Sequence, residues 1–264
     1  MQQKNTNQLR ILAAAAAGVW LVVRLVDLLL WTDTATGFVT LGAAGVRYAA
    51  LAVLAVLCLA AGYTVPDGKP SVRRGAKGIA FLMTGSGVLL TLSGLLSLPA
   101  VMSPNGGVIE LLNSLMPMLS GVWMMVFGLR AEALPLPDED LPGAYWVTVP
   151  FVGFGWQLLH WFVINPSAVQ RVYHTVWVLA YAVALVFLVA LAKLFVMPDL
   201  TRTRGLVTAG LLAFLLLSAS LLPQVVVAFL DGNATLPQLM QGLGMGGFGA
   251  CGLVCALCCE ATAE

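Results

Sequence analysis

Charge is what this sequence has least of. Only 9% of its 264 residues are Asp, Glu, Lys or Arg and 60% are hydrophobic, whereas soluble domains are about 25% charged. A water-soluble fold cannot bury that much apolar surface, so the composition predicts a chain whose surface faces lipid. The sequence has no basic stripe with interleaved aromatic residues, so we expect no nucleic-acid partner.

Cofactor motifs are missing as well. No Walker-type loop is present, and the glycine-rich stretch 242–252 neither follows a strand nor precedes a lysine. The chain has two histidines, with no HxxxH or HExxH pattern. All five cysteines fall in predicted helices, and the run 251–259 has helical spacing with no turn to wrap around a metal. We therefore predict no cofactor and no metal site.

Long apolar runs are what the sequence does contain. A membrane span needs about 20 mostly apolar residues. We predict eight, at 11–31, 42–62, 78–99, 108–129, 145–164, 171–196, 205–230 and 238–259. The first is longer than the apolar core of a signal peptide, so we expect it to be retained. The predicted fold class is an all-α polytopic integral membrane protein, with residues 1–264 forming a single membrane domain.

Basic residues predict the orientation of these spans. Ten of the thirteen Lys and Arg residues fall at one end of the predicted helices, and such an excess marks the cytoplasmic side. We therefore expect a multi-pass protein of the cell membrane with both termini in the cytoplasm.

An acidic, proline-rich linker, 132–143, divides the chain into halves 1–131 and 144–264. The segment 109–121 aligns without gaps on 237–249, which favours two four-helix repeats of parallel orientation. Chance similarity between apolar helices is the alternative interpretation.

Charged and polar side chains cluster near the outer ends of the predicted spans, whereas the inner halves contain almost no ionisable residue. Charges inside a span are costly and often functional. Arg24 and Asp27 lie three residues apart, on one helix face with Trp20 and Trp31. We take ten residues as candidate substrate-binding residues: Arg24, Asp27, Arg47, Glu110, Asn113, Gln157, His160, His174, Gln224 and Gln241. In the alternative interpretation, these groups pair locally, reach the interface or cross-link helices.

These observations predict a transporter, or the membrane subunit of one, that binds a small polar or anionic solute in an outward-facing cavity between two helix bundles. The expected partners are the lipid bilayer, that solute and a further subunit. Two alternatives stay open. One is a lipid-modifying enzyme that uses Asp27, Glu110, His160 and His174, although no nucleophile pattern is present. The other is a non-catalytic subunit of a membrane complex.

Overall fold

The computed structural model describes residues 2–103, 107–131, 144–164, 171–197 and 201–262. Helices dominate these ranges, as expected for an all-α chain. The predicted linker 132–143 lies outside the described residues, as do the predicted turns at 165–166 and 198–199.

Most helices coincide with the predicted spans to within a few residues. They are α1 (Gln2–Trp31), α2 (Ala44–Tyr63), α3 (Ala76–Val101), α4 (Val108–Arg130), α5 (Ala144–Ile164), α6 (Val172–Val196), α7 (Thr203–Ala213), the π-helix η4 (Phe214–Leu221), α8 (Leu222–Leu230) and α9 (Leu236–Cys258). The segments α7, η4 and α8 follow one another without a break and form one rod. In the described part of the chain, seven helical rods are long and apolar enough to cross a membrane, at Asn7–Trp31, Ala44–Tyr63, Ala76–Val101, Val108–Arg130, Val172–Val196, Thr203–Leu230 and Leu236–Cys258. Helix α5, with 21 residues, covers the remaining predicted span.

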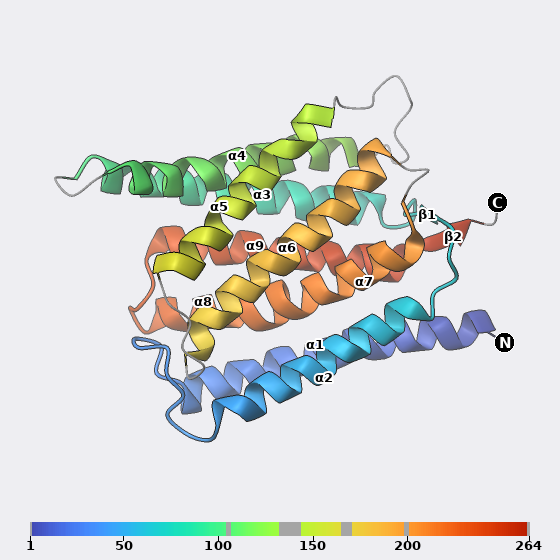
Figure 1. Ribbon diagram of the computed structural model, residues 1–264, viewed down its shortest axis with the longest axis horizontal. Helices are drawn as coiled ribbons and strands as arrows, with labels where there is room; N and C mark the ends of the chain where they lie inside the picture. Colours follow the sequence, from blue (N-terminus) through green and yellow to red (C-terminus); the bar gives the residue numbers. More distant parts are fainter. Residues whose placement is uncertain (1, 104–106, 132–143, 165–170, 198–200, 263–264) are drawn as a thin grey trace.

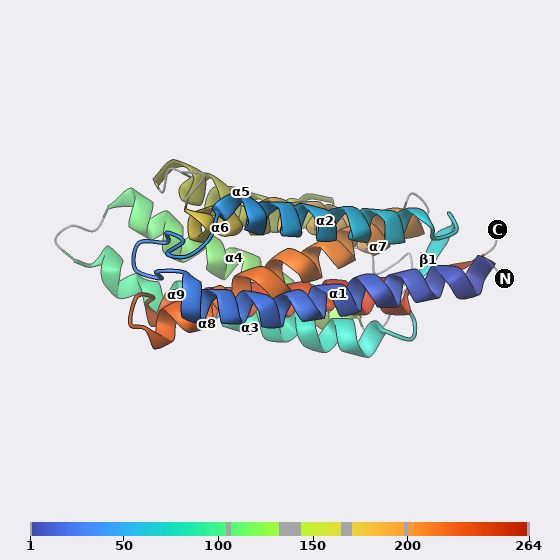
Figure 2. The ribbon, with the colours of Figure 1, turned by 90° about the horizontal axis from the view of Figure 1, so that it is seen from below.

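The rods run along the long axis of the molecule, with α5 and α6 inclined to the others (Figure 1). Helix α9 packs against α3 and against the α7–η4–α8 rod, and α3 also packs along α4. Helices α1 and α2 form a hairpin along one side of the bundle (Figure 2). Both termini lie at the same end of the bundle (Figure 1).

Small residues let α9 approach its neighbours closely. A Cβ atom added to Gly242 would lie 2.7 Å from the Val225 side chain of α8, and one added to Gly246 would lie 3.1 Å from Leu222. A larger side chain at Gly242 would therefore push α8 away. The close helix crossing expected of small residues at four-residue spacing is present here.

The winding of the α7–η4–α8 rod changes in its middle, where η4 replaces α-helical geometry. Pro223 at the start of α8 has no N–H to donate, so a carbonyl one turn earlier loses its regular partner. Two serine hydroxyls of this segment donate to carbonyls: Ser220 Oγ to that of Leu215 at 2.8 Å, and Ser218 Oγ to that of Gly246 in α9 at 2.6 Å. Trp20 of α1 donates its Nε1–H to Ser220 Oγ at 2.9 Å, which ties the hairpin to this segment.

The end that carries the termini holds two features that the sequence did not predict. Strand β1 (Lys69–Ser71) pairs antiparallel with β2 (Glu260–Thr262). Arg10, which the topology prediction treats as a flanking residue, is 7% exposed and donates to the Cys259 carbonyl at 2.8 Å. A cation is favourable beside the free carbonyls of a helix C-terminus. Cys259 itself lies one residue beyond α9, which corrects the prediction that every cysteine is helical.

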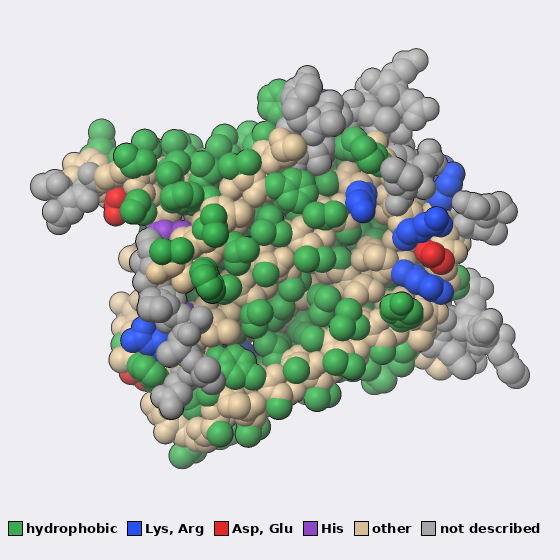
Figure 3. All heavy atoms as spheres, in the orientation of Figure 1, with side chains coloured by type: hydrophobic (Ala, Val, Ile, Leu, Met, Phe, Trp, Pro, Cys, Tyr) green, Lys and Arg blue, Asp and Glu red, His purple; other side chains and the backbone are tan. Residues whose placement is uncertain are grey.

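The surface divides as expected for a chain in lipid. Hydrophobic side chains cover the middle of the face in Figure 3, whereas Lys and Arg side chains gather mainly at the end that carries the termini. Large apolar side chains point outward from the rods, with Val53 67% exposed and Phe81 78% exposed. Water would penalise this exposure, but hydrocarbon does not.

Candidate binding pocket between α1 and α2

Asp27 lies between two arginines. Its Oδ2 accepts a hydrogen bond from Arg24 Nη1, one helical turn earlier in α1. Its Oδ1 accepts a 2.8 Å bond from Arg47 Nε of α2, whose Nη2 lies 2.5 Å from the same oxygen. The carboxylate therefore joins the two helices of the hairpin.

This charge cluster is nearly closed to its surroundings. Arg24 is 2% exposed, Asp27 is 6% exposed, and the Arg47 side chain is 12% exposed. A buried charge is tolerable only when it is paired and hydrogen-bonded. Two cations share one anion, so the cluster carries a formal charge of +1.

Helices outside the hairpin hold Arg24 in position. Its Nη2 donates to Gln224 Oε1 of α8 at 3.1 Å. Gln224 is fully buried and donates its own Nε2–H to the Tyr173 carbonyl of α6 at 2.8 Å. Arg24 is therefore fixed to the body of the bundle through a satisfied amide.

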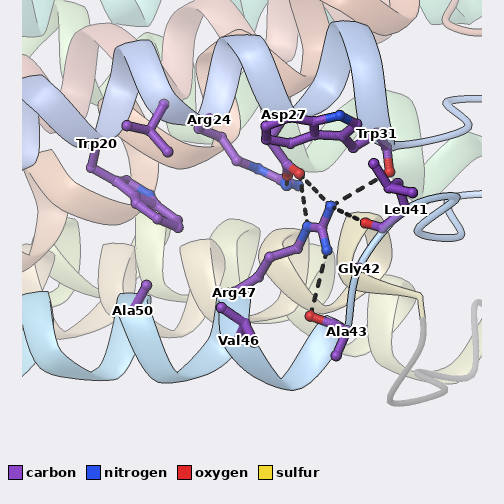
Figure 4. A pocket seen from close by; sticks show the side chains of 11 residues that line it. Trp20, Arg24, Asp27, Trp31, Leu41, Gly42, Ala43, Val46, Arg47 and Ala50 are labelled. Atoms are coloured by element: carbon purple, nitrogen blue, oxygen red, sulfur yellow. Dashed lines mark hydrogen bonds and ion pairs between the residues drawn. The ribbon is translucent and has the colours of Figure 1, made fainter.

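The connection between α1 and α2 positions Arg47. Gly42 has a φ of 82°, a conformation that glycine adopts without steric cost. The turn directs backbone carbonyls at the guanidinium: Arg47 Nη2 lies 3.0 Å from the Leu41 oxygen and 3.5 Å from that of Trp31. Figure 4 shows these carbonyls and Asp27 arranged around Arg47.

The cluster lies in a pocket of about 390 Å³. The lining residues come from α1, α2 and their connection: Trp20, Val23, Arg24, Asp27, Trp31, Leu41, Gly42, Ala43, Val46, Arg47 and Ala50. Figure 4 shows the side chains of both helices directed into the space between them. Apart from the three charged residues, the wall is apolar. Its volume lies in the range of small-molecule sites.

A second polar group lies deeper in the bundle. Gln241 of α9 donates Nε2–H bonds to Gln157 Oε1 of α5 at 3.1 Å and to the Tyr181 hydroxyl of α6 at 2.5 Å. All three side chains are buried. They line a cavity of about 10 Å³, together with Ser120, whose buried hydroxyl has no hydrogen-bond partner among the described residues. That volume suits about one water molecule.

A third polar group joins α4 to α5. Trp156 Nε1 donates to Asn113 Oδ1 at 2.9 Å, and Asn113 Nδ2 lies 3.3 Å from His160 Nε2. Glu110 caps its own helix, since its Oε2 accepts from the Gly107 N–H at 3.0 Å. His174 packs edge-on against Tyr173, with ring centroids 5.4 Å apart.

The ten predicted residues thus lie in several separate contacts rather than in one site. Arg24, Asp27, Arg47 and Gln224 come together, and the first three line the α1–α2 pocket. Gln157 joins Gln241, and Asn113 joins His160, while Glu110 and His174 belong to neither pair. The pocket lies between α1 and α2, within the first predicted half of the chain. The sequence had predicted a cavity between the two halves.

Sequence reasoning missed several contributors to these groups. The carbonyls of Leu41, Trp31 and Tyr173 have no sequence signal, because every residue carries one. Tyr181 and Ser220 were also missed as partners of polar side chains. Trp20 and Trp31 were placed on the face of Arg24 and Asp27, and both line the pocket.

Metal chemistry finds little support in the described ranges, where no three His, Cys, Asp or Glu side chains come together to hold an ion. No protein-family model matches the chain, and the curated proteins and the solved structures give no match either.

Proposed function

We propose that this chain is a membrane transport protein, or the membrane subunit of one, which binds a polar or anionic substrate at the α1–α2 pocket. The observation that carries the proposal is the pair Arg24 and Arg47 around the single carboxylate of Asp27, at the edge of a 390 Å³ cavity. Guanidinium groups suit carboxylate and phosphate, because their fixed charge and planar donors match both. The excess positive charge favours such a group.

The proposed topology has eight crossings, with α5 as the fifth. Helix α5 has the length and position of the predicted fifth span, and both termini share one end of the bundle, as an even number requires (Figure 1). We place that end in the cytoplasm of a cell-membrane protein, because basic side chains gather there (Figure 3). The pocket then lies toward the outside.

We also retain two related four-helix halves as part of the proposal. In the first half Trp20 and in the second half Trp156 each donate an indole N–H to a polar side chain of another helix. This correspondence supports the repeat that the gapless alignment indicated.

An enzymatic role receives less support from the pocket. Among the residues that the structure describes, the lining includes no histidine, cysteine, serine or threonine. Asp27 is the one carboxylate among these lining residues, and both of its oxygens accept bonds from arginines. An acid or base needs a proton-exchanging group within reach of the substrate, and the two histidines lie elsewhere.

Transport is tested with the full chain reconstituted in liposomes. Uptake of radiolabelled acetate, succinate, inorganic phosphate and stearate is measured for the wild type, R47Q and R74Q. Arg74 pairs with Glu260 on the exposed surface at 2.7 Å and serves as the matched control. We expect at least one anion to cross faster than in protein-free liposomes. We also expect R47Q to slow that anion at least about tenfold, as for losing a charge-assisted bond, with R74Q at the wild-type rate. Equal rates with and without protein for every anion would refute transport.

A further inference from the structure

The wall of the α1–α2 pocket combines two kinds of chemistry. Arg24, Asp27 and Arg47 form a charged patch, and the other eight lining residues are apolar or glycine. A small hydrated anion would gain nothing from those apolar walls. A molecule with an acidic head and a hydrocarbon chain would contact both parts favourably.

The depth of the pocket fits one leaflet of a bilayer. Asp27 lies four residues before the end of α1 and Arg47 is the fourth residue of α2. At about 1.5 Å per residue, Asp27 and Arg47 lie roughly 5–6 Å inside the helix ends, and Arg24 lies roughly 10 Å inside. Trp20, at the far end of the lining, lies roughly 16 Å inside by the same rise. The hydrocarbon core is about 30 Å thick, so the pocket extends from its edge to near the midplane.

The mouth of the pocket faces sideways. Val23 of α1 is 47% exposed and Val46 of α2 is 69% exposed, and both belong to membrane-length helices. All of the described lining residues belong to this hairpin and its connection. The pocket therefore opens between α1 and α2 to the surrounding lipid, and Arg47, whose side chain is 12% exposed, is the most accessible of its charged residues.

The net charge of the arginine–aspartate cluster determines which charge the polar head of a ligand should carry. Both oxygens of Asp27 are engaged by the two arginines, which leaves one positive charge without a counter-ion in the part of the chain that the structure describes. In a low-dielectric site, an opposite charge from the ligand is strongly favoured and a second cation is excluded.

We propose that the α1–α2 pocket binds an anionic amphiphile that enters from the membrane. Its carboxylate or phosphate lies against Arg47, the more exposed of the two arginines, and its hydrocarbon chain lies along Trp20, Val23 and Val46. This inference rests on the proposed function, because it takes the same pocket as the substrate site and names the class of substrate.

The test uses the tryptophans of the pocket as reporters. Bromine quenches indole fluorescence on contact, and Trp31 is a 39% exposed lining residue. The full chain in a non-ionic detergent at pH 8 is titrated with dibromostearate and, separately, with its uncharged methyl ester. A third titration uses a dibrominated phosphatidic acid. The ester has the same chain without the charge, so the difference isolates the head.

We expect both anionic probes to quench at concentrations at least about tenfold lower than the ester. R47Q should abolish that difference, and W31F should remove most of the excess quenching. A50L, which adds side-chain volume to the pocket wall and keeps all three charged residues, should weaken both anionic probes. This variant keeps the test valid if R47Q does not fold. R74Q should behave like the wild type.

Two outcomes would overturn the inference. The first is equal quenching by dibromostearate and its ester. The second is displacement of dibromostearate by equimolar acetate or inorganic phosphate, which would show that the site takes a free anion. If uptake of small anions still depends on Arg47 in either case, the proposed transport function stands without this inference. Head-selective quenching without uptake of any anion would instead support the amphiphile site and refute transport.

Discussion

Arg24 and Gln224 lie 200 positions apart in the chain and are joined by a 3.1 Å hydrogen bond. The bond connects α1 to α8, and Gln224 also donates a hydrogen bond to a backbone carbonyl of α6. The charged hairpin is therefore not an independent arm of the bundle. Its central cation, Arg24, is held in place by the rod that contains η4.

Replacement of Gln224 with leucine should destabilise the fold. The change leaves a buried Arg24 donor and the Tyr173 carbonyl without their partner, which costs about 1–3 kcal/mol. SDS-induced unfolding in micelles measures the loss. Gln8→Leu on the exposed start of α1 is the control, and equal effects of the two changes would contradict the role of the bond.

Asp27→Asn should be more damaging than Gln224→Leu. It removes the one anion between two buried cations, and breaking such a cluster costs about 3–5 kcal/mol. The double variant D27N/R47Q should recover part of that loss, because one cation leaves with the anion. The same unfolding assay decides, with exposed Asp67→Asn as the control. A double variant that is no more stable than D27N would argue against charge imbalance as the cause.

Gly87→Ala should separate α3 from α4, although Gly85→Ala, two residues away, should not. A Cβ atom on Gly87 would lie 2.5 Å from the Gly121 carbonyl, whereas nothing lies within 4 Å of a Cβ atom on Gly85. Alanine in an open helical position gains about 0.5–1 kcal/mol over glycine, so G85A should be neutral or stabilising. Thermal unfolding of both variants measures the difference, and matching transition temperatures would refute the predicted clash.

Maleimide labelling should select Cys258 over the other four cysteines. Cys58, Cys251, Cys255 and Cys259 are buried, and Cys258 is partly exposed. Burial also raises the pKa of the Cys259 thiol to about 12, so its reactive thiolate is scarce at neutral pH. Mass spectrometry of the folded protein should find one label per chain, lost in C258A. Labelling of Cys259 at a similar rate would contradict the packing of this end.

The connection between α1 and α2 should loosen in acid. The Asp33 carboxylate accepts bonds from the Thr36 hydroxyl at 2.5 Å and the Ala35 N–H at 3.0 Å, and these bonds lower the pKa of Asp33. A depressed carboxylate pKa stabilises the folded loop above the ordinary aspartate range, and this contribution is lost as pH falls through the lowered pKa. Hydrogen exchange of residues 33–40, corrected for its intrinsic pH dependence, should therefore quicken in acid. D33N should show no such transition, and a wild type that matches D33N would be the contrary result.

Much of the architecture was predictable from the sequence because apolar length alone requires a helix in lipid. The spans 78–99 and 108–129 differ from α3 and α4 by at most two residues at either end. Local spacing also placed Arg24 and Asp27 on one face with Trp20 and Trp31, as helical periodicity demands. The η4 segment was not predictable, because its geometry depends on Ser218 bonding to α9 as well as on Pro223.

The sequence by itself determined the class of protein and the identity of its costly side chains, because composition and helical periodicity are local properties. Tertiary structure decided which of those side chains meet. It brought Arg47 and Gln224 to Arg24 and Asp27, and it placed Glu110, Asn113 and His160 in other contacts. The physical reason is that a helix face fixes the direction of a side chain only relative to its own axis. Its partner is chosen by how the helices pack, and backbone carbonyls complete the site without any signal in the sequence.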